Sequence, residues 1–267
     1  KTAMRLKRPT LLAFAFAEPG GRYDLAHVAT RARRNGKGFT LDGHKSVVFH
    51  AATADRIIVS ARTAGGVRDH NGVTLFLVDA DADGLTRRAY QTVDGLRAAE
   101  VTLDRVSVSS DAVVGEVGGA YPVIAWTVDL GIAAVAAEAA GIMAALNRQT
   151  LDYLKARRQF GRPLSEFQVL RHRMVDMFAA AELSKSMAYM AAVRAGDGDA
   201  PARARAVSAA KVQVDKAGRF VGQQAVQLHG GMGMSDELPV GHYFKRLTMI
   251  DTLFGDVDYH LRRFAGG

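Results

Sequence analysis

The residue types in this 267-residue sequence exclude several kinds of chemistry. There is no cysteine, so thiolate catalysis, disulfides and cysteine metal sites are excluded, and a reducing cytoplasm is the expected compartment. The eight histidines show no metal-ligand spacing, so we expect no metal. The chemistry to look for is therefore acid–base catalysis by carboxylates and the binding of anions by arginines and glycine-rich turns.

An arginine and two glycines stand near the ends of two predicted helices. Arg157 and Phe160 lie near the end of the helix expected at 121–156, and Gly230-Gly231 follow the helix expected at 202–228. Taken singly, each has an ordinary structural explanation. Arg157 could be a solvated cation near a helix C-terminus, Phe160 could pack in the core, and Gly230-Gly231 could be a helix C-cap.

The overall charge fits an anionic partner but does not locate its site. The formal net charge is +8 and the pI is near 9.9. The basic residues are scattered and form no recognition motif, so we expect a polyanionic small molecule and no nucleic acid. Polar and glycine residues (Asp129, Gly131, Glu138 and Gly141) interrupt the most apolar stretch, 121–146. That stretch predicts a helix buried in protein and no membrane partner.

Residues 11–118 are typical of β-structure. Residues 38–51 predict a hairpin, with Asp42-Gly43 at its turn. Short apolar or alternating runs follow at 55–62, 72–80 and 100–108. No helix-length segment separates these runs, which predicts an antiparallel, barrel-like sheet.

The pattern becomes helical after Gly118-Gly119. Helices are expected at 121–156, from Ser165 to about Arg194, at 202–228 and at 239–253, with a short one after them. Ser165 and Gln168 have the spacing of a capping box at the start of the second helix. The sequence therefore predicts an α+β protein. A β-domain over residues 1–118 precedes an antiparallel four-helix bundle over 119–267.

Five stretches carry a resemblance to a known family: AEPGGRYD (17–24), LDGHKSVVFHA (41–51), YLKARRQFGRPLSEFQ (153–168), AVQLHGGMGM (225–234) and HYFKRLTMIDTLFGD (242–256). In order and spacing they resemble the middle and C-terminal domains of acyl-CoA dehydrogenases. The family's helical N-terminal domain has no counterpart in this sequence. The resemblance implies FAD as cofactor, an acyl-CoA as substrate and an electron-transferring flavoprotein as electron acceptor.

The resemblance also implies roles for the residues at the two helix ends. In the family, FAD lies between subunits, and the helical domain of one subunit holds the adenosine diphosphate. Arg157 would face the pyrophosphate through charge-assisted hydrogen bonds, and Phe160 would pack on the adenine side. Gln227, Gly230 and Gly231 would approach the diphosphate and ribitol, and Gln159 occupies a place where a hydrogen-bonding residue is common.

The catalytic base expected from the resemblance is missing. Most members carry a glutamate after the aromatic residue of the last stretch, but Gly255 follows Phe254 here. Other members supply the glutamate from the first helix of the bundle, where the register gives Gly131. Two nearby carboxylates could act instead. One is Asp256, and the other is Glu138, which could alternatively be a buried carboxylate paired with an arginine.

The stretch that resembles the flavin-contacting hairpin also departs from the family. Val47 and Phe49 replace a common aromatic residue and a common threonine. With these departures, the chain resembles the small subunits of heteromeric bacterial enzymes such as pimeloyl-CoA dehydrogenase. Three alternatives follow: a subunit whose partner carries the base, a self-sufficient homotetramer that uses Asp256 or Glu138, and a scaffold without activity.

Overall fold

The computed structural model describes residues 10–266. The chain folds into two compact units that divide between Ala125 and Trp126. This division falls inside a helix, and the domain boundary expected between residues 118 and 119 stays a prediction.

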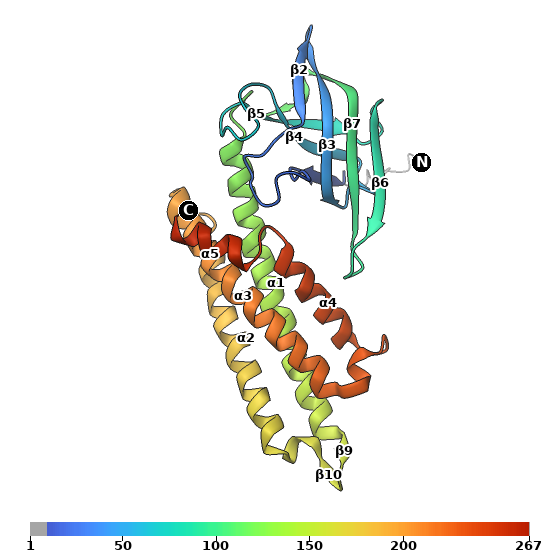
Figure 1. The fold of residues 1–267 in the computed structure, drawn as a ribbon, viewed down its shortest axis with the longest axis vertical. Coiled ribbons are helices and arrows are strands. Elements are labelled where there is room, and N and C mark those ends of the chain that lie inside the picture. Colours follow the sequence, from blue (N-terminus) through green and yellow to red (C-terminus); the bar gives the residue numbers. More distant parts are fainter. Residues whose placement is uncertain (1–9, 267) are drawn as a thin grey trace, which may run out of the picture. The chain divides into compact units, whose positions relative to one another are not determined.

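The first unit is built on one sheet (Figure 1). Its strands are β1 (Leu12–Ala15), β2 (Arg31–Asn35), β3 (Gly38–Phe49), β4 (Arg56–Arg62), β5 (Val73–Asp79), β6 (Leu85–Gln91), β7 (Arg97–Ser109) and β8 (Val113–Val114). They lie in the order β6-β7-β3-β2-β4-β5-β8, and β1 pairs with β4. Neighbouring strands are antiparallel as predicted, except that β1 and β2 each run parallel to β4.

The predicted hairpin at 38–51 is wrong, because β3 is one continuous strand of 12 residues. Its pairing with β7 shifts register between Leu41 and Gly43, so Asp42 lies in a β-bulge. The Asp42 side chain accepts a hydrogen bond from the backbone N–H of Arg105 (2.9 Å). The turn between β2 and β3 lies at Gly36, whose φ is +56°. An Asp-Gly pair can form a bulge as well as a turn. Here it forms a bulge, because β3 pairs with β7 on both sides of Asp42.

The second unit is helical (Figure 1). Its helices are α1 (Tyr121–Ala156), α2 (Gln168–Arg194), α3 (Ala200–His229), α4 (Pro239–Thr252) and α5 (Val257–Ala265). A two-stranded ribbon, β9 (Arg158–Gln159) and β10 (Arg162–Pro163), joins α1 to the 3-10 turn Leu164–Glu166, and another 3-10 turn, Gly230–Met234, follows α3. Helix α3 packs against α2, α4 and α5. The predicted α+β class is confirmed.

The predicted capping box at Ser165 is wrong. Ser165 lies inside the 3-10 turn, and α2 begins at Gln168 after Phe167, with no side-chain cap. The extra turn uses the residues that would otherwise have formed the first turn of the helix. Side-chain caps are present at α3 and α5, where Asp199 and Asp256 accept backbone N–H groups.

By length and composition alone, α1 could cross a membrane, since its most apolar 18-residue window has a mean hydropathy of 1.6. Half of that window is buried within the protein, and the core helix of a soluble protein passes the same test. Asp129, within this helix, is fully buried and ion-paired to Arg203 (2.9 Å) and Arg263 (2.5 Å). Burial of this kind fits the helix predicted from the interrupted apolar stretch.

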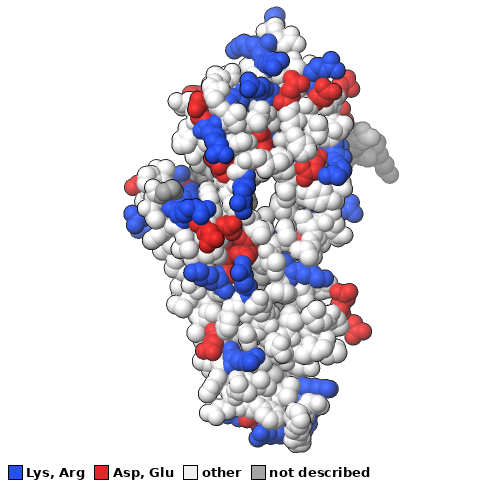
Figure 2. All heavy atoms as spheres, viewed as in Figure 1, with Lys and Arg blue, Asp and Glu red and all other residues white. Residues whose placement is uncertain are grey.

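Basic and acidic side chains are interspersed on the face of the molecule that Figure 2 shows. Blue lysine and arginine patches stand beside red aspartate and glutamate patches in both units. This face therefore carries mixed charge, and specific anion binding there has to come from local geometry.

Candidate functional site

An open cavity of about 650 Å³ lies in the helical unit, where the C-terminal ends of α1 and α3 face the start of α2. Its lining consists of Tyr153, Arg157, Gln159, Leu164, Leu170, Arg173, Gln227, Leu228, His229, Gly230, Gly231 and Met232. Five of the six residues predicted to bind the cofactor therefore line one cavity, although up to 74 positions separate them in the sequence.

Electrostatics in this cavity favour an anion. Two lining residues, Arg157 and Arg173, carry positive charge, and none of the described lining residues is a carboxylate. The Arg173 guanidinium donates a hydrogen bond to the side chain of Gln224 (3.3 Å), which leaves further donors of its fork for a ligand. Two guanidinium groups in one cavity suit the bidentate recognition of phosphate oxygens.

The glycine turn after α3 borders open space. Gly230 has a left-handed φ of +58° and its N–H bonds to the carbonyl of Gln227, so the helix C-cap considered from the sequence is confirmed. A β-carbon added to Gly230 or Gly231 would meet nothing within 4 Å. Internal packing therefore does not require glycine here, and the turn leaves room for a ligand to approach the backbone closely.

His229 and Tyr153 form the wall of the cavity beside this turn. The His229 ring is buried, stacks on Tyr153 with ring centroids 4.4 Å apart, and donates from Nδ1 to the carbonyl of Ala225 (2.8 Å). Because a carbonyl can only accept, Nδ1 carries the proton, and in the neutral ring Nε2 is an acceptor.

Phe160 is the predicted binding residue that does not line the cavity. It lies at the tip of the β9–β10 ribbon with a left-handed φ of +56° and is 90% exposed. Its closest ring neighbour is Phe167, in an edge-on contact with centroids 6.1 Å apart. The core-packing alternative is wrong, because the ring projects from the ribbon toward solvent.

Among the polar and aromatic residues of the cavity wall, sequence reasoning did not single out Tyr153, Arg173 or His229. Tyr153 precedes Arg157 by one helical turn, and the Arg157 N–H bonds to its carbonyl (2.8 Å), so the i, i+4 spacing was an available signal. Arg173 had no such signal. It reaches the cavity only because α2 packs beside α3.

The two carboxylates considered as bases are both engaged. Both oxygens of Glu138 accept from Arg246, at 2.6 and 2.7 Å, so the predicted pairing with an arginine is confirmed. The Glu138 side chain is 41% exposed, however, so the expectation of burial is wrong. Asp256 accepts the Tyr259 N–H (2.8 Å) as the cap of α5. A catalytic role for either residue stays a prediction.

In the β unit, a buried ion pair joins the two stretches at 17–24 and 41–51. The Lys45 ammonium lies 2.7 Å from Glu18 and also donates to Ser60 (2.9 Å). Glu18 accepts the N–H groups of Ala29 and Thr30 as well. Burial lowers the pKa of Lys45 to about 8. Burial raises the pKa of Glu18, but Lys45 and the other hydrogen bonds outweigh it and hold this pKa below its usual value.

Val47 follows this pair on β3, with a left-handed φ of +51° and 46% exposure. Glu100 lies beside it and accepts hydrogen bonds from the Val47 N–H (3.4 Å), Tyr90 (3.0 Å) and His44 (2.8 Å). Burial raises the pKa of Glu100, but these three hydrogen bonds outweigh it and hold the pKa below its usual value. The strand thus presents an exposed aliphatic side chain in the stretch where the resemblance implies an aromatic one.

The acyl-CoA dehydrogenase C-terminal domain matches residues 121–266, and the acyl-CoA dehydrogenase middle domain matches residues 13–106. The chain belongs to the acyl-CoA dehydrogenase family. Homologues in this family are FAD-dependent flavoproteins.

The relatives cover the same two domains. The short-chain specific acyl-CoA dehydrogenase of Megasphaera elsdenii is 32% identical, over 89% of this chain and 63% of its own length. The structure of butyryl-CoA dehydrogenase from Megasphaera elsdenii is 28% identical with a TM-score of 0.88, over 96% of this chain and 67% of that one. A structure described as the Tcur3481-Tcur3483 steroid ACAD is 32% identical with a TM-score of 0.82, over 96% and 66%. The chain thus spans about three fifths of the length of the first of these relatives.

The cavity fits the phosphate half of FAD. Arginine donors, an open glycine turn and the absence of carboxylates from the described lining match the charge and hydrogen-bonding pattern of a diphosphate. Beside Val47, its own N–H and the side chains of His44 and Tyr90 are bonded to the Glu100 carboxylate. The residues present therefore fit the adenosine diphosphate end of the cofactor.

Proposed function

We propose that this chain is an FAD-binding subunit of an acyl-CoA dehydrogenase. Its helical unit supplies the site for the adenosine diphosphate half of FAD, and a homologous partner subunit supplies the catalytic base. The assembly would oxidise an acyl-CoA thioester between its α and β carbons.

The cavity at the ends of α1 and α3 carries this proposal. Arg157, Gln159, Gln227, Gly230 and Gly231 were chosen from the sequence and line one cavity, together with Arg173. The exposed Phe160 on the ribbon tip supports a ligand shared with another chain, because its ring has a free face beyond the cavity.

Bound FAD would supply the two-electron acceptor for the oxidation. The chain's own residues would bind and orient it. Arg157 and Arg173 would neutralise the diphosphate, Gln227 would hydrogen-bond to it, and the glycine turn would let it approach the backbone. The Tyr153–His229 pair would form an aromatic wall.

The engaged carboxylates support a base on another subunit. A general base needs an available carboxylate within hydrogen-bond reach of the substrate proton. Glu138 is held by both oxygens, and Asp256 caps a helix. The Tcur3481-Tcur3483 steroid ACAD, which is 32% identical, is described by two components. It supports a pairing of unlike chains and brings steroid acyl-CoA thioesters into the substrate range.

We further propose an electron-transferring flavoprotein as the electron acceptor and the cytoplasm as the compartment. A solved neighbour described as an electron transferring flavoprotein of Acidaminococcus fermentans is 25% identical with a TM-score of 0.88, which supports the family's link to such proteins. The absence of cysteine fits a reducing compartment.

The visible spectrum tests the proposed function. The chain is purified alone, and then with a homologous subunit that carries the glutamate. We expect little flavin alone and about one flavin per unlike pair, bleached by acyl-CoA. Full flavin occupancy and bleaching by the chain alone would refute the subunit role.

Arginine variants test the cavity in the same preparation. Arg157→Met and Arg173→Met should each weaken FAD binding at least tenfold, because each removes charge-assisted hydrogen bonds. Arg148→Met, an exposed arginine of α1 outside the cavity, is the matched control and should bind FAD like the wild type. Equal affinities in all three variants would place the diphosphate elsewhere.

A further inference from the structure

Helix α2 has a buried side and a strongly apolar exposed side. It lies along the edge of the helical unit (Figure 1), and its buried residues recur every three or four positions. The exposed side includes a row with the same spacing: Val175, Phe178, Glu182, Lys185, Tyr189 and Val193. Residues with this spacing lie on one face of a helix. The four apolar members are between 59% and 79% exposed, so packing within this chain does not account for them.

The row is charged only at its middle. Large apolar side chains scattered singly over a surface are normal, but a continuous row of them marks an interaction site. Nζ of Lys185 lies 3.8 Å from Oε2 of Glu182, and both side chains are about half exposed. This separation is too long for a hydrogen bond, so both charged groups can bind a partner. The row therefore consists of one acid and one base with apolar residues on either side.

The order of residues makes the row complementary to itself. In an antiparallel pair of α2 helices with a two-fold axis between positions 183 and 184, Glu182 faces Lys185 of the other copy. Phe178 faces Tyr189 of the other copy in the same register. A two-fold contact requires such a match, because the same surface lies on both sides of it. In a parallel pair, each charged residue would face its own counterpart, and like charges repel. Charge therefore favours an antiparallel second copy of this chain as the occupant.

The size of the row indicates how strong such a contact can be. From Val175 to Val193 it is about 27 Å long, and a helix is about 10 Å wide. The strip thus covers on the order of 300 Å² per chain, less than the roughly 800 Å² per partner that a stable complex of two proteins buries. Such a contact is weak by itself. It becomes effective when another interface already holds the chains in one assembly, because the local concentration is then high.

We propose that the exposed row of α2 binds the same row of a second copy of this chain in antiparallel register, and so joins two unlike pairs into one four-chain assembly. The joining of unlike pairs rests on the proposed function, but the contact between the two α2 helices does not. Phe178 and Tyr189 provide most of the apolar contact area. Glu182 and Lys185 set the orientation, because exposed charge pairs contribute more to specificity than to affinity.

The mass of the assembly tests this role of α2. Sedimentation velocity of the unlike pair with its flavin should give two copies of each chain for the wild type. Phe178→Ser and Glu182→Lys should each halve the mass without loss of flavin, whereas the double variant Glu182→Lys/Lys185→Glu should restore the full mass. Asp176→Lys is the matched control and should keep the full mass. Asp176 is exposed on α2 but lies about 100° around the helix from Val175.

Several results would overturn the proposal. They are a single unlike pair for the wild type, a full mass for both Phe178→Ser and Glu182→Lys, or a halved mass for Asp176→Lys. Loss of the unlike pair in Phe178→Ser would assign the row to the unlike interface and would overturn it as well. The flavin content separately tests the proposed function. A four-chain assembly without flavin would refute that function and leave the α2 contact standing.

Disulfide trapping tests the register in this chain alone. The sequence has no cysteine, so an introduced cysteine is the only one. On oxidation, a mixture of Phe178→Cys and Tyr189→Cys should form a dimer, whereas each variant by itself should not. Antiparallel pairing separates the two copies of either position by about 16 Å along the helix, and a disulfide needs Cα atoms within about 7 Å. A mixture that forms no dimer, or single variants that form dimers as readily as the mixture, would overturn the antiparallel contact.

Discussion

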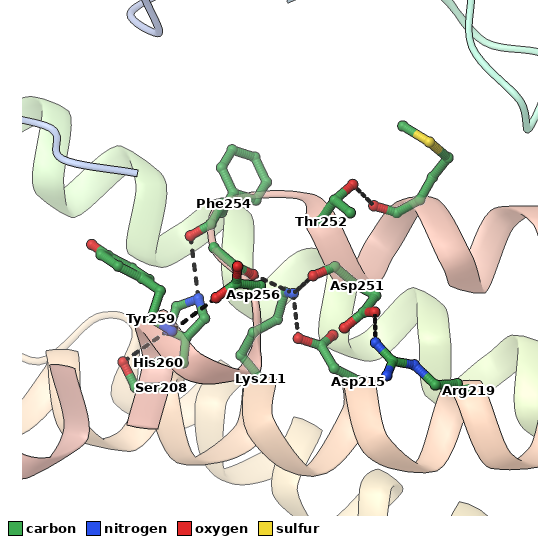
Figure 3. A network of polar contacts seen from close by, with 12 residues as sticks. Ser208, Lys211, Asp215, Arg219, Asp251, Thr252, Phe254, Asp256, Tyr259 and His260 are labelled. Carbon is green, nitrogen blue, oxygen red and sulfur yellow. Dashed lines mark hydrogen bonds and ion pairs between the residues drawn. The ribbon is translucent and has the colours of Figure 1, made fainter. Parts of the chain in front are cut away.

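Replacement of Lys211 by methionine should destabilise the helical unit strongly. Its ammonium makes three contacts inside a fully buried site, at 2.6, 2.9 and 3.3 Å. Burial raises the pKa of Asp215 and lowers that of Lys211, and the 2.6 Å contact between the two groups opposes both shifts (Figure 3). Removal of one partner of a buried ion pair typically costs about 3–5 kcal/mol.

The double variant Lys211→Met/Asp215→Leu separates two contributions to stability. One is the ion pair between Lys211 and Asp215, and the other is the pair of hydrogen bonds from Lys211 to the carbonyls of Asp251 and Gly255. An apolar replacement of both charges is often close to neutral. Each of the two carbonyls left without its donor should still cost about 1 kcal/mol or more, because an unsatisfied buried acceptor is unfavourable. We therefore expect the double variant to lose about 2 kcal/mol, roughly half of the loss in the single variant.

Urea unfolding provides the assay. Trp126 is the chain's only tryptophan and lies in the helical unit, where its indole N–H donates to the carbonyl of Ala195 (3.0 Å). Its fluorescence and the far-UV circular dichroism at the helix band should report the same transition. In thermal unfolding, the single variant should lose about 10 °C in Tm. If Lys211→Met lowered the free energy of unfolding by less than about 1 kcal/mol, as for an exposed ion pair, Lys211 would not stabilise the fold in this way.

Three further results are expected. Lys45→Met should lower the free energy of unfolding by about 3–5 kcal/mol, because it leaves Glu18 buried without its cation. Urea unfolding of the β unit, followed by circular dichroism, would measure this loss. In the wild type the folded-state pKa of Glu18 is lowered, so its contribution should be complete above the unfolded value of 4.5 and lost as pH falls through the folded value. An unfolding series without such an acid-labile component would contradict that assignment. Asp129→Asn should lower the free energy of unfolding by about 3–5 kcal/mol, because it leaves Arg203 unpaired in the core. Glu138→Gln in the same helix should lower it by about 1 kcal/mol or less, because the pair of Glu138 with Arg246 is partly exposed. Equal Tm losses for these two variants would show that burial does not set the cost.

The sequence predicted the features that depend on local chemistry. The apolar period gave the long helix at 121–156 with the bounds that the structure has. The motif around Arg157 and the glycine turn at 230–231 identified one side of the cavity. Such features are local because helix periodicity, proline and glycine act over a few residues.

Other features depended on contacts between distant segments. Asp42-Gly43 became a bulge because β7 pairs with β3 on both sides of it. Arg173 entered the cavity only through the packing of α2 beside α3. The glycine at 131 looked from the sequence only like the place of a lost base, whereas in the structure a β-carbon there would lie 2.9 Å from the ring of Phe254, which is distant in the sequence. Composition and spacing determined the elements and the family. Only the tertiary structure decided which side chains share a space, because steric exclusion and burial depend on segments far apart in the sequence.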